Sequence, residues 1–381
     1  MRFDTRVIHD GQPPDPSTGA VNVPVYLSST FVQEAPNVNR GFVYARSGNP
    51  TRAVLEKVLA RLEGGHTGLA FSSGLGALAT LLLHFPQGSR IVADEDLYGG
   101  TFRLFEHFRT QYRFTIDSVD MTQPKAAAAA IAARPTALVY CETPTNPLLR
   151  VIDIRSLAGA ARRRGAPLAV DSTFASPAIQ RPIELGADIV LHSTTKYLGG
   201  HSDILGGALV LKDSSLGERL TWLQNAVGAV PSVVDCFLVL RGIRTLGLRM
   251  RAHSRNALAV ARALEKESAV TAVHYPGLRS HPQHALAARQ MDGGGGMLSF
   301  EMRGGEKGVR RFLSRLRVFA LAESLGGVES LVEHPASMTH ASVPRADRER
   351  HGLTEGLVRL SCGVEDARDL VEDLHRALGS R

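Results

Sequence analysis

Short apolar runs alternate with longer helix-like segments through the first half of the chain. The runs fall at residues 68–71, 91–93, 137–141, 168–170 and 189–191. Apolar runs of this length are typical of strands that are buried on both faces of a sheet. Because strands and helices alternate along the chain, the pattern predicts a mostly parallel α/β sheet with right-handed crossovers.

Helical periodicity fills several of the segments between these runs. Residues 51–62 place apolar side chains on one face, behind a proline that suits a first helical turn. The apolar segment 77–84 predicts a second helix, and the pattern from 232 to 266 predicts one long helix that links two domains. Residues 1–50 contain several prolines and no steady periodicity, which predicts an irregular segment that wraps a neighbour or serves function.

A second group of strand-like segments occupies the last third of the chain. These segments fall at residues 270–273, 297–302, 319–321 and 357–361, and a final helix runs to about residue 378. We therefore expect three parts, which are an N-terminal arm over residues 1–50, a larger domain over residues 51–245, and a smaller C-terminal α/β domain over residues 246–381.

Each of the five runs in the first half is followed by a group that can bind or react. In chain order these groups are Ser73 with Gly74, Tyr98, Asn146, Asp171 and Lys196. The carboxyl ends of parallel strands share one edge of a sheet, and ligands of α/β proteins bind at that edge. We therefore expect the five groups to meet at one site.

A lysine at this edge suggests pyridoxal phosphate (PLP). A partly desolvated lysine such as Lys196 can lose its proton and form a Schiff base with a carbonyl. The hydroxyls beside it, and the turn at Ser73 and Gly74 before a helix, suit a phosphate group. Asp171 suits the protonated nitrogen of the PLP ring, and Tyr98 can stack on that ring.

Each of these residues also has a simpler interpretation. Lys196 can be a surface lysine, and Asp171 can cap a helix because Ser172 and Thr173 follow it. Arg359 lies within an apolar strand and needs an anionic partner there. That partner is either a substrate carboxylate or an acidic side chain of the protein. The residues alone leave these alternatives open.

Composition narrows the class of protein. Of the 381 residues, 44% are hydrophobic and 21% are charged, which is ordinary for a globular protein. The formal charge of +7 comes from arginines scattered along the chain, so we expect small anionic substrates and no nucleic-acid partner. The sequence has no signal peptide and no apolar run near the ~20 residues that span a bilayer. The three cysteines have no disulfide or metal spacing, which predicts a cytoplasmic protein without a metal site.

Several longer motifs are more specific than these patterns. They are Tyr-Ala-Arg-Ser-Gly-Asn-Pro-Thr at 44–51, Asp-Ser-Thr-Phe-Ala at 171–175, His-Ser-Thr-Thr-Lys-Tyr-Leu-Gly-Gly-His-Ser-Asp at 192–203, and Glu-Ser-Leu-Gly-Gly-Val-Glu-Ser at 323–330 with Thr-His-Ala at 339–341. Together they resemble the γ-subfamily of PLP enzymes of cysteine and methionine metabolism. This group includes cystathionine γ-lyase, cystathionine γ-synthase, cystathionine β-lyase and methionine γ-lyase, and the resemblance covers essentially the whole chain.

The resemblance implies a fold, an assembly and a cofactor site. The fold is the aspartate-aminotransferase-like fold type I of PLP-dependent transferases, and the assembly is a homotetramer of two active dimers. Lys196 then bonds PLP covalently and carries protons, Asp171 pairs with the ring nitrogen, and Tyr98 stacks on the ring. The phosphate is held by Gly74, Leu75, Ser193 and Thr195, together with Tyr44 and Arg46 of the neighbouring subunit.

The resemblance also implies residues that bind an amino-acid substrate. Asn146, Ser324 and Arg359 hold its carboxylate. Glu323 matches an acidic position that cystathionine γ-lyases and γ-synthases share, and Arg103 stands where γ-lyases have an arginine that contacts the distal part of the substrate.

Two further positions bear on which member of the family the chain resembles most. Gly100 replaces a cysteine characteristic of methionine γ-lyase, which counts against that activity. Val43 stands where γ-lyases and γ-synthases commonly have an acidic residue, which weakens the expected grip on a distal ammonium group. We expect cystathionine γ-lyase activity, with cystathionine γ-synthase and then β-lyase as alternatives. A non-catalytic basic binding protein on the same scaffold is a further alternative.

Overall fold

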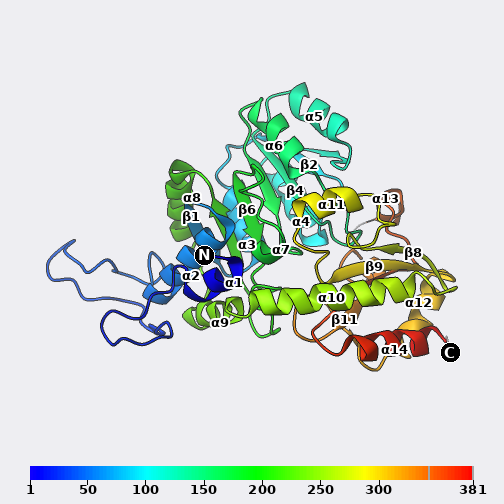
Figure 1. The fold of residues 1–381 in the computed structure, drawn as a ribbon. Helices are drawn as coiled ribbons and strands as arrows, with labels where there is room; N and C mark the ends of the chain where they lie inside the picture. Colours follow the sequence, from blue (N-terminus) through cyan, green and yellow to red (C-terminus); the bar gives the residue numbers. More distant parts are fainter. Residues whose placement is uncertain (342–343, 380–381) are drawn as a thin grey trace.

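The computed structural model describes residues 1–341 and 344–379, with a larger and a smaller sheet (Figure 1). The larger sheet has the order β1-β7-β6-β5-β4-β2-β3. Strand β7 is antiparallel to both of its neighbours, and the other pairs are parallel, so the predicted mostly parallel sheet is confirmed. The strands are β1 (Thr67–Phe71), β2 (Arg90–Asp94), β3 (Thr115–Val119), β4 (Leu138–Glu142), β5 (Leu168–Asp171), β6 (Ile189–His192) and β7 (Gly207–Leu211).

Helices cover both faces of this sheet. Along β7, Ala208 and Val210 pack with residues of α2, whereas Leu209 and Leu211 pack with residues of α3 and α8. Strands with apolar side chains on both faces are therefore buried as predicted. The helices of this part are α2 (Pro50–Glu63), α3 (Gly74–Leu82), α4 (Gly99–Gln111), α5 (Pro124–Ala133), α6 (Ile154–Arg162), α7 (Ser176–Ile179) and α8 (Ser214–Val227).

The smaller sheet has the order β10-β11-β12-β9-β8 and its own apolar core. Its strands are β8 (Val270–His274), β9 (Met297–Met302), β10 (Ala320–Leu321), β11 (Leu331–Glu333) and β12 (Leu357–Ser361). The helical elements around it are α11 (His284–Gln290), α12 (Gly305–Leu313), the 3₁₀ turn η1 (Pro335–Ser337), α13 (Arg345–Arg350) and α14 (Ala367–Leu378). Two sheets with separate cores are compatible with the two predicted domains, whose boundaries stay a prediction.

The long helix predicted over residues 232–266 is wrong in one respect. Two helices are present, α9 (Val233–Ile243) and α10 (Leu246–Leu264), and the helical structure is interrupted at Thr245. The Thr245 hydroxyl donates to the Gly242 carbonyl at 3.2 Å and accepts from Arg249 Nε at 3.2 Å. A hydroxyl that bonds locally competes with the helical ladder. Helix α10 still links the two parts, because it contacts α7 on one side and α14, β8 and β9 on the other (Figure 1).

The N-terminal segment contains one element that the sequence pattern does not predict. Helix α1 (Phe3–His9) lies within residues 1–50 and buries Val7 against α2. Asp4 in its first turn and His9 in its last turn suit the helix dipole. Strands β3 and β11 also fall where no strand is predicted. Among the described residues, no helix combines the length and apolar character required to cross a membrane.

Candidate active site

A cavity of about 360 Å³ lies at the carboxyl edge of the larger sheet, where segments of the smaller-sheet part close over it. All five strand ends contribute to its walls, as predicted from their positions after the strands. The lining from the larger part includes Ser73, Gly74, Leu75, Tyr98, Asn146, Asp171, Ser193, Thr195 and Lys196. Segments of the smaller part add Glu323, Ser324, Thr339 and Arg359.

Lys196 is half-buried in the wall of this cavity and is not a surface lysine. It follows β6 after a turn in which its backbone N–H donates to the Ser193 carbonyl at 3.2 Å. Its Nζ donates to Ser324 Oγ at 2.7 Å. Burial, and then the positive charge of Arg359, lower the pKa of Lys196 to about 8, although Glu333 and Glu323 oppose the shift. At pH 7 about a tenth of the molecules therefore carry Lys196 as a neutral, nucleophilic amine, many more than for an ordinary lysine.

Asp171 ends β5 and turns its carboxylate toward the same cavity. It is not the cap of α7, whose preceding residue is Ala175. Its Oδ1 instead accepts the Thr173 N–H at 2.9 Å. Burial raises the pKa of Asp171, although Thr173, His192 and Tyr140 act in the opposite direction. A buried carboxylate is stabilised by a cation, so this position fits the protonated ring nitrogen of PLP.

The start of α3 forms a cradle suited to a phosphate. Ser73 caps the helix by accepting the Gly76 N–H at 2.9 Å, while Gly74 and Leu75 occupy its first turn. Free N–H groups and the helix dipole attract anions there. A Cβ on Gly74 would lie 3.2 Å from the Cβ of Ser193, so the two segments meet closely. Gly74, Ser193 and the nearby Thr195 thus fit the phosphate of PLP.

Tyr98 lies at the start of α4, where Glu142 holds its backbone. The Tyr98 N–H donates to both Glu142 oxygens at 3.0 Å, and Thr101 Oγ1 donates to Oε1 at 3.0 Å. Burial, and then the neighbouring Asp171, raise the pKa of Glu142 well above its usual value. Sequence reasoning missed Glu142. The available signal is its position as the last residue of β4. Asn146 is the functional residue that the sequence pattern predicts after this strand.

Arg359 has the acidic protein partner that was one of its two predicted alternatives. Its Nη2 forms an ion pair with Glu333 Oε2 at 2.7 Å, and both side chains are buried. The predicted alternative of a protein partner is therefore confirmed. Nη1 also donates to Asn146 Oδ1 at 2.8 Å, and Arg359 lines the cavity. The guanidinium thus remains available to a substrate carboxylate, which stays a prediction. The pattern gave no signal for Glu333, because its pairing with Arg359 arises across β11 and β12.

Three predicted site residues lie outside the cavity lining. Tyr44 is 48% exposed, and Arg46 Nη1 donates to the Asn225 carbonyl at 2.6 Å and side-chain oxygen at 2.9 Å. Both border a separate surface hollow. Such exposure is compatible with a role toward a neighbouring subunit, which stays a prediction. Arg103 lies on α4 beside Gly99. Within the described residues, no cluster of His, Cys, Asp and Glu could hold a metal ion.

Two curated proteins are similar to this chain over nearly its whole length. Cystathionine γ-synthase of Mycobacterium tuberculosis is 52% identical over 98% of this chain and 96% of its own. Cystathionine β-lyase of Coxiella burnetii is 49% identical over 99% of this chain and 97% of its own.

Solved structures agree with these relatives. Cystathionine γ-synthase of Xanthomonas oryzae in complex with cystathionine has a TM-score of 0.97 at 48% identity, covering 100% of this chain and 98% of its own. Cystathionine γ-lyase of Lactobacillus plantarum complexed with L-serine has a TM-score of 0.96 at 44% identity, covering 100% of this chain and 99% of its own. The predicted aspartate-aminotransferase-like fold type I of PLP enzymes is therefore confirmed.

The match to a protein family agrees with the geometry of the site. The sequence model of the Cys/Met metabolism PLP-dependent enzymes matches residues 4–379. Lys196, Asp171 and the start of α3 fit the carbonyl, the ring nitrogen and the phosphate of PLP, as described above. The relatives are cystathionine enzymes, which removes the non-catalytic binding protein as an alternative. The chain belongs to the Cys/Met metabolism PLP-dependent enzymes, and its cofactor is pyridoxal phosphate.

Proposed function

We propose that this enzyme breaks the Cγ–S bond of cystathionine and, with one water molecule consumed, releases cysteine, 2-oxobutanoate and ammonia. The observation that carries the choice of cystathionine as ligand is Glu323 in the cavity wall, beside Ser324 and close enough to Lys196 to affect its pKa. A carboxylate at this position suits a substrate that carries a second ammonium group far from the reacting carbon, and cystathionine is such a substrate.

The residues of the cavity can perform the proton transfers that γ-elimination needs. Bound PLP supplies a carbonyl for the substrate amine and a ring that accepts electrons. Arg359 and Asn146 orient the substrate carboxylate. Lys196 then removes the proton on the α-carbon and the proton on the β-carbon. An amine with a pKa of about 8 can both accept and release these protons near neutral pH.

Ser324 fixes the starting position of that amine. Its Oγ accepts from Lys196 Nζ at 2.7 Å, and its backbone carbonyl accepts from Arg359 Nη2 at 3.1 Å. One residue therefore links the general base to the group that orients the substrate. This arrangement holds the amine near the α-carbon of a substrate whose carboxylate lies on Arg359.

Cystathionine γ-synthase is the second candidate, in which cysteine is joined to an O-acylated homoserine. It is favoured by the M. tuberculosis and X. oryzae proteins, both of which carry that name. A γ-synthase also needs proton removal from the α- and β-carbons, so the same lysine serves both reactions. Cystathionine β-lyase, the name of the C. burnetii relative, is the third candidate.

Identification of the keto acid formed from L-cystathionine separates these activities. Purified protein with added PLP is incubated with L-cystathionine, and the products are identified by mass spectrometry. 2-Oxobutanoate with cysteine supports the γ-lyase, whereas pyruvate with homocysteine contradicts it in favour of the β-lyase. If folded, yellow protein forms no keto acid but makes cystathionine from cysteine and an O-acylhomoserine, the γ-synthase replaces the proposal.

We also propose that the catalytic unit is a dimer within a homotetramer. The exposed side chains of Tyr44 and Arg46 would reach the phosphate site of the neighbouring subunit. Mixing the inactive variants Arg46→Ala and Lys196→Ala tests this, because mixed dimers would contain one intact site. Recovered activity on mixing supports shared sites, and no recovery contradicts them.

A further inference from the structure

A group of polar residues lines the cavity at the ends of β4 and β5 and at the start of α4. Glu142 and Asp171 end the adjacent parallel strands β4 and β5 and are partners in the strand register. Tyr140 lies on the same strand as Glu142, and Tyr98 and Thr101 lie at the start of α4. None of these residues takes part in the proton transfers assigned to Lys196 above.

Glu142 supplies the start of α4 with a cap that its own sequence lacks. Tyr98 is the residue that precedes the helix, and its side chain makes no capping hydrogen bond. The Glu142 carboxyl group takes that place, since it accepts the Tyr98 N–H and the Thr101 hydroxyl, each at 3.0 Å. Unsatisfied N–H groups at a helix start are costly when buried, so these bonds fix the backbone of Tyr98.

The ring of Tyr98 is also closely packed by its neighbours. A Cβ on Gly100 would lie 2.4 Å from Tyr98 Cε1 and 3.1 Å from Leu75 Cδ1. The ring therefore packs against the backbone of Gly100, and Tyr98 also lines the cavity. A shift at the start of α4 would move this ring relative to anything bound in the cavity.

We propose that Glu142 is a positioning residue, which fixes the ring of Tyr98 over the bound cofactor by holding the start of α4. The proposal rests on the placement of Tyr98 against the PLP ring. Neither Lys196 nor the substrate requires a negative charge on the buried Glu142. The proposal therefore assigns this carboxyl group a positioning function. Glu142 acts through hydrogen bonds that a neutral acceptor can also form.

The surroundings of Glu142 favour this neutral role. Burial and the neighbouring Asp171 raise the pKa of Glu142 well above its usual value, which favours a hydrogen-bond acceptor without charge at this position. The Tyr140 hydroxyl is fully buried, and it lies close enough to Thr101 and Asp171 to interact with both side chains.

The test measures PLP affinity and kcat for Glu142 variants with and without Tyr98. Glu142→Ala removes the acceptor, and Glu142→Asp shortens the side chain by one methylene. We expect both to weaken PLP binding and lower kcat by about 10-fold or more, because misplacing a site group by ~1 Å costs up to ~100-fold. Glu142→Gln keeps the length and one acceptor oxygen, and we expect it to restore most of the loss.

A double-mutant cycle with Tyr98→Ala separates positioning from general damage. In the Tyr98→Ala background, Glu142→Ala should cause little further loss of PLP affinity, since the group that it positions is gone. Equal losses in both backgrounds overturn the proposal, and so does Glu142→Ala with unchanged PLP affinity. If Tyr98→Ala alone leaves the visible spectrum and affinity of PLP unchanged, the placement of Tyr98 fails and the proposal fails with it.

Asp373 provides a matched control for the loss of a buried carboxylate. It is fully buried in the smaller part and accepts the N–H groups of Arg317, Val318 and Phe319 at 2.8–3.0 Å. We expect Asp373→Asn to reduce stability while the PLP affinity stays unchanged. Because PLP affinity and the PLP spectrum do not depend on the product, these two measurements test the proposal whether the enzyme is a γ-lyase or a γ-synthase.

Discussion

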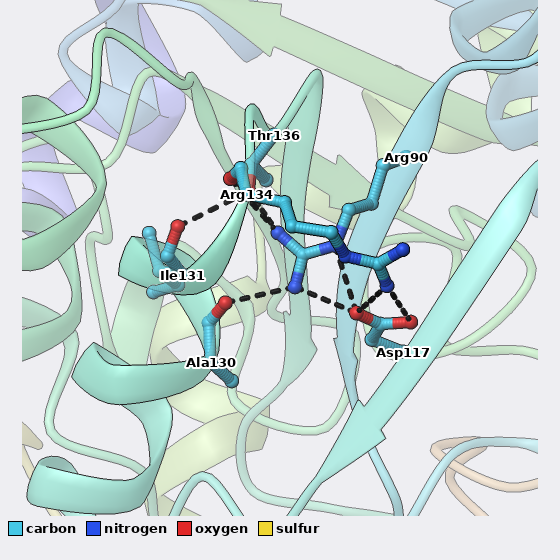
Figure 2. A network of polar contacts seen from close by, with 6 residues as sticks. All are labelled: Arg90, Asp117, Ala130, Ile131, Arg134 and Thr136. Atoms are coloured by element: carbon cyan, nitrogen blue, oxygen red, sulfur yellow. Dashed lines mark hydrogen bonds and ion pairs between the residues drawn. The ribbon is translucent and has the colours of Figure 1, made fainter.

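The two ends of the larger sheet differ in whether the protein supplies partners for their ionisable side chains. At the amino end, Arg90 opens β2 and the protein itself satisfies its guanidinium (Figure 2). Arg90 donates to Asp117 Oδ2 at 2.7 Å, to Thr136 Oγ1 at 2.7 Å, and to the carbonyls of Ala130 at 2.8 Å and Arg134 at 3.1 Å. Arg134 adds a second bond to Asp117 at 3.0 Å.

At the carboxyl end, Asp171, Glu142 and Lys196 line the cavity without an ion-pair partner among the described contacts. Asp171 and Glu142 lie side by side with raised pKa values, and burial lowers the pKa of Lys196. Their neighbours are hydroxyls, backbone N–H groups and one another. Buried charges without partners are unfavourable in the protein alone, and such groups cluster where a ligand provides what is missing. The contrast distinguishes a structural network from a binding site.

The largest effect is expected from Lys196→Ala, which removes the reactive amine at the carboxyl end. We expect the rate of product formation to fall by about 10²–10⁴-fold or more, because the variant loses its proton-transferring group. The thermal midpoint of the cofactor-free protein should not fall, since burial disfavours the Lys196 ammonium. Turnover at the normal rate would show that this lysine is not the reactive one.

A pair of Asp→Asn substitutions tests the comparison most directly. Asp171→Asn keeps an acceptor for Thr173 but removes the charge, so we expect ~100-fold lower activity and a more stable cofactor-free protein. Asp117→Asn should leave the activity of folded protein unchanged and cost about 1–2 kcal/mol of stability. Urea unfolding and kcat/KM measure these effects, and two stability changes of the same sign would contradict the comparison.

Lowering the pH should change the stability contributions of Asp117 and Asp171 in opposite directions, which gives a second test of the comparison. Burial by itself raises the pKa of Asp117, but hydrogen bonds from Arg90 and Arg134 bring it below its ordinary value of 3.8. Its contribution to stability is therefore present above pH ~3.8 and is lost as pH falls through the lowered folded-state pKa. The pKa of Asp171 is raised, so its unfavourable contribution is present at neutral pH and is relieved as pH falls through that pKa.

Substitution of Arg90 tests the amino end by itself. Arg90→Met keeps much of the packing of the side chain. It removes the donor to the Ala130 and Arg134 carbonyls, and Asp117 then pairs with Arg134 alone. We expect a loss of about 2–3 kcal/mol, which urea unfolding measures, because removing one partner leaves buried polar groups unpaired. The PLP spectrum of the folded variant should match that of the parent protein. A changed spectrum would mean that the two ends are coupled.

The smallest expected effect is a shift in a pH profile. Capture of PLP by the cofactor-free protein should rise with pH through about 8, where the Lys196 amine becomes neutral. The Glu323 carboxylate raises the pKa of Lys196, so Glu323→Gln should move this midpoint to lower pH. Glu323→Asp keeps the charge and is the matched control. A midpoint near 10.5 for the parent protein would show that Lys196 is not desolvated.

Local sequence patterns were sufficient for the strands that carry the site. Runs such as residues 189–191 are apolar on both faces, and the parallel crossover rule brings their carboxyl ends to one edge. This is why Lys196, Asp171 and Tyr98 could be expected at one place before any contact was known. The pattern was weaker for β3, which has a largely half-buried sequence, and for α1, which has only one buried side chain.

Contacts between distant segments were beyond the reach of such patterns. The pairing of Arg359 with Glu333 depends on the register of β11 and β12, and the bond from Lys196 to Ser324 joins residues from different parts of the fold. Likewise, Glu142 meets Tyr98 only because β4 lies beside β2 in the sheet. Partners of this kind follow from strand order, which periodicity does not encode.

The sequence by itself determined which chemical groups stand at the strand ends, because side-chain identity and strand periodicity are local properties. The tertiary structure decided the state of those groups. Burial and the charge of Arg359 bring the pKa of Lys196 to about 8, and Asp171 raises that of Glu142. Desolvation and Coulomb interactions depend on everything packed around a group. The reactivity of the site is therefore a property of the folded chain, whereas its inventory of residues is a property of the sequence.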